Sequence, residues 1–303
     1  MTDEPASYIG RFAPSPTGPL HFGSLLAAVA SYAQARTRHG HWLLRIEDID
    51  PPREQPGADK LILDSLESYG FEWDGPVTYQ SSFAAHHEQR VQELLESGLA
   101  YPCSCSRKDL AEFPRGPLGI IYPGTCRQGS TSDEAAIRIR TDNEPIEFQD
   151  ALQGAHLQRL EPESGDFIIK RRDGLIAYHL AVVVDDFHQG ITEIVRGIDL
   201  LDSTPRQIRL QRAFGFPTPG YMHIPVAVNN EGQKLSKLTG AKGIDTIRAS
   251  ETLFDALRAL RQDPPGDLRQ ESCAEIWNWA LANWKADRLA GQTEIPALPY
   301  GYG

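Results

Sequence analysis

The sequence predicts an α/β protein built on a parallel sheet, and two observations carry this expectation. First, apolar strands at 8–13 and 42–46 flank a helix at 22–38 whose apolar residues recur at helical spacing, which is a β–α–β unit. Second, the loop from the first strand into that helix, RFAPSPTGPLHFG, holds three prolines and two glycines. Ligands of open α/β sheets bind beyond the carboxyl ends of the strands, so we expect this stiff loop to border a binding site.

The rest of the chain is predicted to hold both helices and strands. The stretch 178–186 is apolar and β-branched and then carries two aspartates, so we expect it to begin as a helix and then turn. Residues 101–126 hold three of the four cysteines and little regular pattern, which indicates an insertion. Periodicity predicts helices at 57–69, 83–97, 204–214, near 250–262 and near 271–288, and strands at 136–141, 166–170 and 191–197.

Composition narrows the class of protein. The chain has 303 residues with 40% hydrophobic content, enough for about two domains or one body with an insertion. Its net charge of −11, from 30 basic against 41 acidic residues, argues mildly against a protein that coats nucleic acid. The triplet 170–172 offers a local basic face, although it is equally typical of a solvated strand end.

Neither a leader nor a membrane span is expected. The N-terminus is acidic, and the longest nearly apolar stretch, 175–184, has 10 residues, whereas a bilayer needs about 20. The expectation is a cytoplasmic enzyme with no membrane contact.

Two stretches carry residues suited to phosphate. His21 stands at the start of the helix at 22–38, with Gly23 and Ser24 in its first turn, where backbone N–H groups and the helix dipole favour an anion. The second stretch, GQKLSKLTGAK at 232–242, places Lys234 and Lys237 around small residues. Each has an ordinary alternative, a histidine packed against its own loop and a solvated lysine run. Neither stretch matches a Walker loop or a dinucleotide fingerprint.

Together the two stretches resemble the signature pair of class I aminoacyl-tRNA synthetases. HFGS at 21–24 stands where that class has its HIGH motif, and KLSKL at 234–238 where it has KMSKS. The string GRFAPSPTGPLHFGSL is similar to the glutamyl and glutaminyl enzymes, as are LLRIEDID, YHLAVVVDD and VRGIDLLDSTPRQI further along. The resemblance runs from residue 8 to about 240 and implies a Rossmann-like doubly wound parallel sheet with a zinc-binding insertion and a short C-terminal helical element.

The resemblance also implies a reaction and the residues that serve it. In this family the α-carboxylate of L-glutamate attacks the α-phosphorus of ATP, with Mg²⁺ on the phosphates, to give glutamyl-adenylate. The implied catalytic residues are His21, Gly23, Lys234 and Lys237, and the implied ATP-binding residues are His21, Gly23, Ser24 and Lys237. The implied glutamate-binding residues are Arg11, Phe12, Ala13, Pro14, Ser15, Glu47, Tyr178 and Arg196. Arginine suits carboxylates because its planar fork binds both oxygens. His179 departs from the family pattern, which more often has Asn there.

The clustered cysteines indicate a metal. Cys103, Cys105 and Cys126 lie within 24 positions, and in a cytosolic chain such clusters point to metal binding rather than disulfides. A closed zinc site needs four ligands, and no fourth Cys or His lies nearby, so inert thiols are the alternative. The resemblance supplies Tyr122 as the fourth ligand and implies one structural Zn²⁺ per chain. Cys273 is expected to belong to the core.

The number of residues that follow the lysine motif distinguishes the branches of the family. The expected segments are a first catalytic half at 1–100, a zinc-containing insertion at 101–165, a second catalytic half at 166–240 and a helical element at 241–303. This short ending resembles the glutamyl-queuosine tRNA(Asp) synthetases, which lack an anticodon-binding domain. The implied partner is then tRNA(Asp) bearing queuosine, with the chain acting as a monomer. A shortened glutamyl-tRNA synthetase and a catalytically silent RNA- or zinc-binding paralogue are the alternatives.

Overall fold

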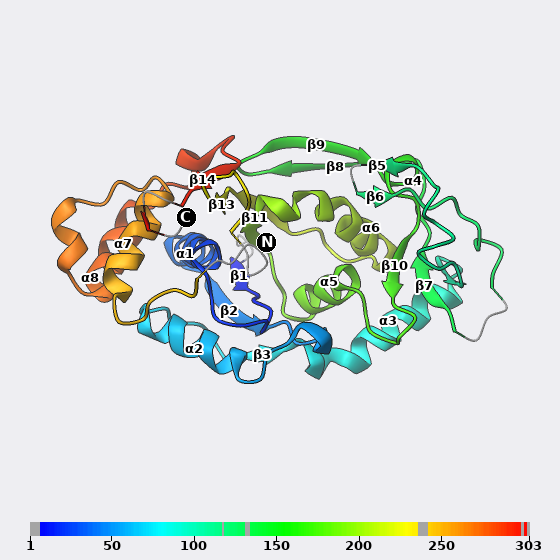
Figure 1. The fold of residues 1–303 in the computed structure, drawn as a ribbon, viewed down its shortest axis with the longest axis horizontal. Helices are drawn as coiled ribbons and strands as arrows, with labels where there is room; N and C mark the ends of the chain where they lie inside the picture. The colour runs from blue at the N-terminus through cyan, green and yellow to red at the C-terminus, as the bar shows by residue number, and fades with distance from the viewer. Residues whose placement is uncertain (1–6, 117, 131–133, 236–241, 298–299, 302–303) are drawn as a thin grey trace, which may run out of the picture.

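The computed structural model is elongated, with the N-terminal elements in one half and the cysteine-rich segment in the other (Figure 1). It describes residues 7–116, 118–130, 134–235, 242–297 and 300–301. None of the helices in these ranges is both long and apolar enough to cross a membrane.

The central sheet is made of two groups of parallel strands. The first group, in sheet order, is β1 (Ile9–Phe12), β2 (His41–Ile46) and β3 (Thr78–Tyr79). The second is β11 (Glu193–Gly197) and β12 (Gly220–Ile224). The groups meet where the Thr192 N–H donates to the Ile9 carbonyl at 2.9 Å. The predicted β–α–β unit and parallel sheet are therefore confirmed.

Helices cover this sheet and define the first core. α1 (Phe22–Thr37) is buried along most of its length, and it packs with the C-terminal helices α7 (Ala249–Ala259) and α8 (Cys273–Asn283). Aromatic rings bind these elements together: Trp42 and Phe71 stack with ring centres 5.5 Å apart, and Tyr32 meets Trp277 edge-on at 4.7 Å. This packing fixes the position of the first turn of α1. α2 (Ala58–Ser68) lies next along the chain.

A second core lies under α3 (Ala84–Glu96), α5 (Tyr178–His188) and α6 (Thr204–Phe214). Beyond it, an antiparallel sheet has the order β10 (Phe167–Lys170), β7 (Ala136–Ile139) and β4 (Ala100–Cys103). The short strands β5 (Arg115–Gly116) and β6 (Gly119–Ile120) and the one-turn helix α4 (Leu160–Glu163) complete this end. We call residues 100–170, apart from the hairpin described next, the cysteine lobe.

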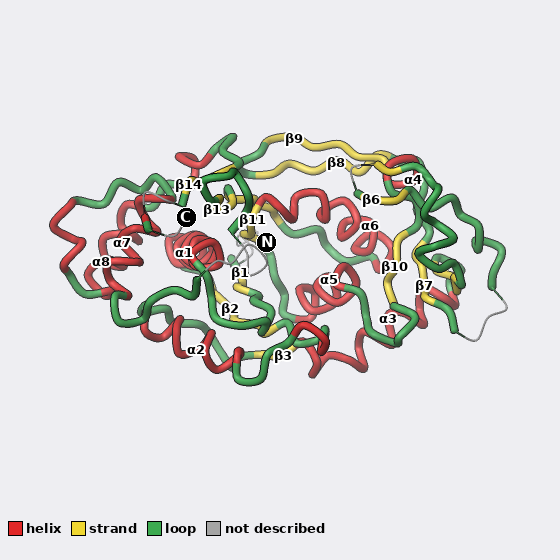
Figure 2. The backbone as a smooth tube through the Cα atoms, in the orientation of Figure 1, coloured by secondary structure: helices red, strands yellow, loops and turns green. Residues whose placement is uncertain are grey.

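A long hairpin runs from the middle of the molecule to the cysteine lobe (Figure 1). β8 (Pro145–Asp150) and β9 (Gly154–Arg159) run along one edge, from beside β14 (Glu294–Pro296) to α4 (Figures 1 and 2). Its turn is held by Gln153, whose Nε2 donates to the carbonyls of His223 and Gln292 at 2.9 Å each. β13 (Val226–Val228) pairs with β14. The sequence analysis predicted none of β8, β9 and β12–β14. Short 3₁₀ turns lie at 51–53, 80–83, 198–203, 266–270 and 286–289.

Two predicted elements differ from the structure. α5 does not turn at its aspartates but continues to His188, because Asp185 and Asp186 are buried inside it and each has a partner: His87 Nε2 lies 2.6 Å from Asp185, and Arg11 binds Asp186. The helix predicted near 271–288 ends at Asn283, and a 3₁₀ turn follows at 286–289. The predicted segment boundaries stay a prediction.

Candidate active site

A cavity of about 550 Å³ opens at the carboxyl ends of β1 and β11. It is lined by the loop that follows β1, the first turn of α1, the end of β11 and the turn between β12 and β13. The structure brings together every predicted site residue of the phosphate and glutamate sets that it describes: Arg11, Phe12, Ala13, Pro14, Ser15, His21, Gly23, Ser24, Glu47, Tyr178, Arg196 and Lys234. Lys237 lies outside the described residues.

The proline loop is fixed by hydrogen bonds to its carbonyls, which prolines can still accept. The Glu47 N–H donates to the Pro14 carbonyl at 3.0 Å, and the Gln55 N–H to the Pro16 carbonyl at 2.9 Å. Gly18 has a φ of 130°, which only glycine adopts readily. The loop is therefore held in one shape against the cavity.

His21 caps the N-terminus of α1. Its Nδ1 accepts the Ser24 N–H at 3.2 Å, so the proton of the neutral ring is assigned to Nε2, which lies 3.2 Å from Ser24 Oγ. Nε2 is then a donor at the helix end where an anion is favoured. A Cβ on Gly23 would lie 3.2 Å from two atoms of the His21 ring, so a side chain at this position would crowd the His21 ring beside the cavity.

Lys234 also lines the cavity and approaches Asp199, with Nζ and Oδ2 2.5 Å apart. Lys234 follows β13, and its side chain is half exposed to solvent. It therefore brings a positive charge to the rim of the cavity, at a distance from the buried charges described next.

Arg11 is held in the cavity wall by a carboxylate. Its Nε and Nη2 donate to Asp186 at 3.0 and 3.3 Å, and Arg45 Nη2 donates to the same carboxylate at 2.8 Å. Arg45 also reaches Glu47 at 3.4 Å. Burial raises the pKa of Glu47 against the pull of Arg45 and Arg11, whereas for Asp186 burial is outweighed by Arg11 and Arg45, which lower its pKa. Arg45 and Asp186 were not among the predicted site residues, although both lie within the family-like strings LLRIEDID and YHLAVVVDD.

Arg196 is held differently. Its Nε donates to His223 Nε2 at 2.9 Å and its Nη2 to Thr204 Oγ1 at 2.8 Å. Its buried Nη1 has no partner among the described residues. His179 is absent from the cavity lining; it packs edge-on against Phe167, and burial lowers its pKa to about 3. The departure of His179 from the family pattern therefore does not change the lining of the cavity.

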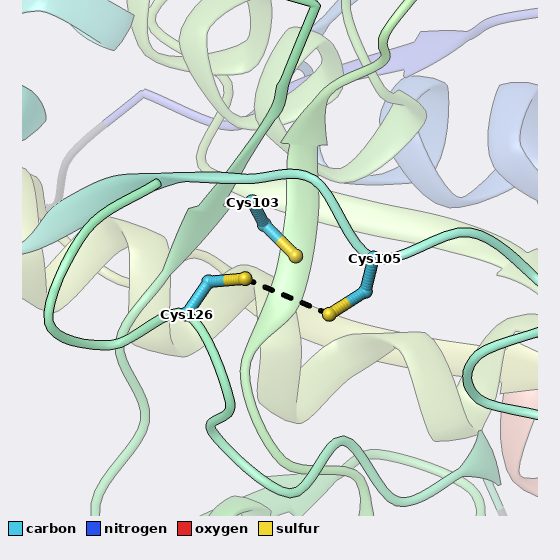
Figure 3. A group of neighbouring side chains, drawn as sticks. All are labelled: Cys103, Cys105 and Cys126. Carbon is cyan, nitrogen blue, oxygen red and sulfur yellow. Dashed lines mark hydrogen bonds between the residues drawn. The ribbon is translucent and has the colours of Figure 1, made fainter. Parts of the chain in front are cut away.

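The predicted metal ligands also meet. Cys103, Cys105 and Cys126 point toward one another from β4 and the segment after it (Figure 3), and their sulfur atoms all lie within 4.8 Å. The Cys105 and Cys126 sulfurs are 3.6 Å apart, and Tyr122 Oη lies 3.3 Å from Cys103 Sγ and 3.7 Å from Cys105 Sγ. Zinc–sulfur bonds of about 2.3 Å in a tetrahedron place ligands about 3.7 Å apart. The donor set therefore fits a zinc ion.

A cation and a backbone donor support this cluster. Arg138 Nε donates to Cys103 Sγ at 3.2 Å, and its guanidinium lies 3.9 Å from the centre of the Tyr122 ring. The Cys126 N–H donates to Tyr122 Oη at 2.9 Å, which orients that oxygen. Cys273 lies apart on α8, partly buried against the first core, as predicted.

Comparison with known proteins agrees with this geometry. Residues 9–258 match the family described as tRNA synthetases class I (E and Q), catalytic domain. A protein of Pseudomonas aeruginosa PAO1, named glutamyl-Q tRNA(Asp) synthetase, is 52% identical over 292 residues, covering 96% of this chain and 98% of the relative. Proteins of the same name from Chromobacterium violaceum and Dechloromonas aromatica are 51% and 50% identical, covering 98% and 97% of those relatives and 96% and 95% of this chain.

Among solved structures, a glutamate tRNA ligase from Elizabethkingia meningosepticum, in complex with its amino acid, superposes with a TM-score of 0.77 at 22% identity. The match covers 95% of this chain and 67% of that one. At this level of identity the likeness concerns the fold.

Proposed function

The chain belongs to the class I tRNA synthetases of the glutamyl and glutaminyl type and is a ligase, and from this premise we propose that it activates L-glutamate with ATP and transfers the glutamyl group to queuosine in tRNA(Asp). The observation that carries the proposal is the shared cavity. Two arginines and a carboxylate, Arg11, Arg196 and Glu47, line the same space as His21 and Gly23. The acceptor rests on the names of the relatives.

Each charged group of glutamate has a candidate partner among the residues of the cavity. Arg196, with an unpartnered buried Nη1, is suited to a substrate carboxylate, since a charged donor–acceptor pair is the stronger kind of hydrogen bond. Arg11 adds a second positive charge to the same wall. Glu47 suits the ammonium group, and Tyr178 contributes a hydroxyl. The loop 11–15 supplies the floor.

The activation step needs little acid–base chemistry. A carboxylate oxygen of glutamate forms a bond to the α-phosphorus of ATP as the bond to the β-phosphate bridging oxygen breaks, and pyrophosphate leaves. His21 Nε2 and the lysines Lys234 and Lys237 stabilise the phosphoryl charge, while Gly23 and Ser24 admit the nucleotide at the start of α1. Mg²⁺, when bound with ATP, neutralises phosphate charge. Such catalysis is positioning together with electrostatic stabilisation.

The second step transfers the glutamyl group. A ring hydroxyl of queuosine attacks the carbonyl carbon of the mixed anhydride, an ester forms, and AMP leaves. A base splayed out of a single-stranded loop is the usual target of specific RNA recognition. One structural zinc, held by Cys103, Cys105, Tyr122 and Cys126, stabilises the cysteine lobe.

The deciding experiment follows labelled glutamate. With ATP, label is offered to tRNA(Asp) with and without queuosine and to tRNA(Glu), each intact or without its terminal adenosine. We expect label only on queuosine-containing tRNA(Asp), whether or not the terminal adenosine is present. Label on tRNA(Glu) that disappears with that adenosine would make the protein a short glutamyl-tRNA synthetase. No activation of glutamate at all would favour a catalytically silent paralogue.

A further inference from the structure

We infer that His223 is a positioning residue of the glutamate pocket: its neutral imidazole holds the Arg196 guanidinium in place for the substrate carboxylate without cancelling its charge. The inference rests on the proposed function, because it takes Arg196 as a glutamate-binding residue. His223 itself does not line the cavity.

A chain of three side chains carries the inference. His223 lies on β12 and is fully buried, with its Nδ1 2.6 Å from Asp150 Oδ2 and its Nε2 2.9 Å from Arg196 Nε. Asp150, at the end of β8, also accepts backbone N–H groups from Leu152 and Gln153 at 3.0 and 2.9 Å. The guanidinium can only donate, so Nε2 must accept and the ring proton must be on Nδ1, where it faces Asp150.

The His223 imidazole lies between the Asp150 carboxylate and the Arg196 guanidinium and keeps the two out of direct contact. Arg11, which also lines the cavity, is bound directly by Asp186, which offsets its charge. Within the part of the chain that the structure describes, Arg196 forms no ion pair, and His223 stands between it and the Asp150 carboxylate. Arg196 is therefore oriented as firmly as Arg11 but keeps its positive charge for a ligand. This makes it the stronger carboxylate-binding group of the two.

Only the neutral ring can do this. A second proton would put an N–H on Nε2, facing the Arg196 Nε–H, and two donors would then repel. Burial lowers the pKa of His223, and Arg196 and His156 act in the same direction, whereas Asp150 raises it. The charged and titratable groups that face His223 are thus Asp150 on β8, His156 on β9, Arg196 on β11 and Tyr221, which lies on β12 with His223 itself. The ring stays neutral near pH 7 and takes a proton as the pH falls.

Two substitutions test the roles of the two ring nitrogens of His223 separately. His223→Asn places an amide N–H near the position of Nδ1 and nothing at Nε2, whereas His223→Gln can place its oxygen near Nε2. In ATP–pyrophosphate exchange we expect His223→Asn to raise the KM for glutamate about tenfold, the size of one lost charge-assisted hydrogen bond, with the KM for ATP nearly unchanged. His223→Gln should recover most of the loss. Equal effects of the two variants, or parallel changes in both KM values, would reduce His223 to a structural role.

The pH profile gives a second readout. Because the pKa of His223 is lowered from its usual value of 6.5, the profiles are measured from there down to the lowest pH at which both proteins stay folded. Over this range the KM for glutamate should rise more steeply in the native protein than in His223→Gln. Glu47 also lines the cavity and its pKa is raised by burial, so the difference between the two profiles, not the native profile alone, reports on His223. Identical profiles would overturn the inference.

Two further measurements keep the outcomes distinct. Nitrogen-15 shifts of the native protein should show His223 protonated on Nδ1 and bare on Nε2 at pH 7; a proton on Nε2 refutes the inference without any variant. Arg196→Ala tests the premise. If it leaves the KM for glutamate unchanged, the pocket assignment of the proposed function fails. If it raises that KM and His223→Asn does not, only the role of His223 fails.

Discussion

Gly23 lies in the first turn of α1, where the proposed function places the nucleotide. An added methyl group would lie 3.2 Å from the His21 ring, so the ring must shift or the ligand must move away. We expect Gly23→Ala to raise the KM for ATP about tenfold, the cost of one displaced contact of about 1.4 kcal/mol, and to leave the KM for glutamate nearly unchanged.

Stability distinguishes this effect from misfolding. Alanine inside a helix is more stable than glycine by about 0.5–1 kcal/mol, so Gly23→Ala should unfold at the same temperature or higher while activity falls. Gly266→Ala is the matched control, because a Cβ there meets nothing within 4 Å. A normal KM for ATP in Gly23→Ala would show that the base does not lie on this turn.

Substitution of Lys237 provides a second test of the residues proposed to stabilise the phosphate charge. It is placed in this role by its position in KLSKL, since it lies outside the described residues. Removing one group that stabilises transition-state charge costs about 10²–10³ in kcat, so Lys237→Ala should lower kcat for pyrophosphate exchange by about that factor and change the KM for glutamate little. Lys60→Ala, an exposed residue on α2 outside the cavity lining, is the control. Equal activity in the two variants would remove Lys237 from the catalytic set.

At this scale the sequence identified the residues that line the cavity better than the residues that support them. Arg11 and Arg196 were predicted because they end apolar strands and match a family pattern. Asp186 and His223 were missed, because a charged residue that acts through another residue has no periodicity of its own. Their roles depend on pairs 175 and 27 positions apart in the chain. Such pairs become visible only once the strands are placed.

Among the elements, the segment between β4 and β7 is the one that the proposed zinc would hold together. Its hydrophobic cluster has five buried residues, Tyr101, Cys103, Leu110, Tyr122 and Cys126, and three of these are proposed zinc ligands. A cluster this small cannot offset the loss of chain entropy without a metal or disulfide. We expect Cys105→Ser to lose most of its zinc, against about one zinc per chain in the native protein, and to become more sensitive to protease between residues 101 and 126.

Cys273→Ser provides the matched control, since Cys273 lies on α8 away from the cluster. Metal analysis of the purified variants is the measurement. Zinc content that is equal in Cys105→Ser, Cys273→Ser and the native protein would contradict the ligand assignment.

The elements that were mispredicted share a cause. The β8–β9 hairpin alternates apolar and polar residues only weakly, as in PIEFQD, and its turn is fixed by Gln153 reaching β12 and the C-terminal segment. α5 was expected to turn at 185–186 because two aspartates seldom lie buried in a helix, yet His87 and Arg11 satisfy them from other elements. In both cases tertiary partners override a correct local preference.

For the whole molecule, the sequence indicated the α/β class and the binding edge, because both follow from local patterns: one β–α–β unit and one unusual loop. It could not show that the two groups of parallel strands meet at Ile9 and Thr192, or that the chain returns after α8 to add β14 beside β13. These pairings join distant segments, and no short window of sequence encodes them.

The cavity and the cysteine lobe lie apart, which implies that activation of glutamate does not require the metal. The cavity is lined from residues 11–53, 178–200 and 224–235, and no described residue of the cysteine lobe contributes to it. The five buried residues of the cysteine cluster belong to neither of the first two cores, although Ala100, Ile139 and Phe167 of the cysteine lobe are part of the second. Loss of zinc should therefore loosen the cysteine lobe while the glutamate and ATP pockets keep their shape.

We accordingly expect Cys105→Ser to keep its kcat/KM for pyrophosphate exchange within about threefold of the native value, a change of about 0.7 kcal/mol. Native protein and Cys273→Ser, assayed at the same temperature, give the reference. A fall in activation that tracks the loss of zinc would instead mean that the cysteine lobe holds the second catalytic half in place. The contacts responsible would then be those through β10, whose Lys170 pairs with Glu88 on α3 at 2.7 Å. Lys170→Ala, with its zinc intact, would in that case reproduce the loss of activation.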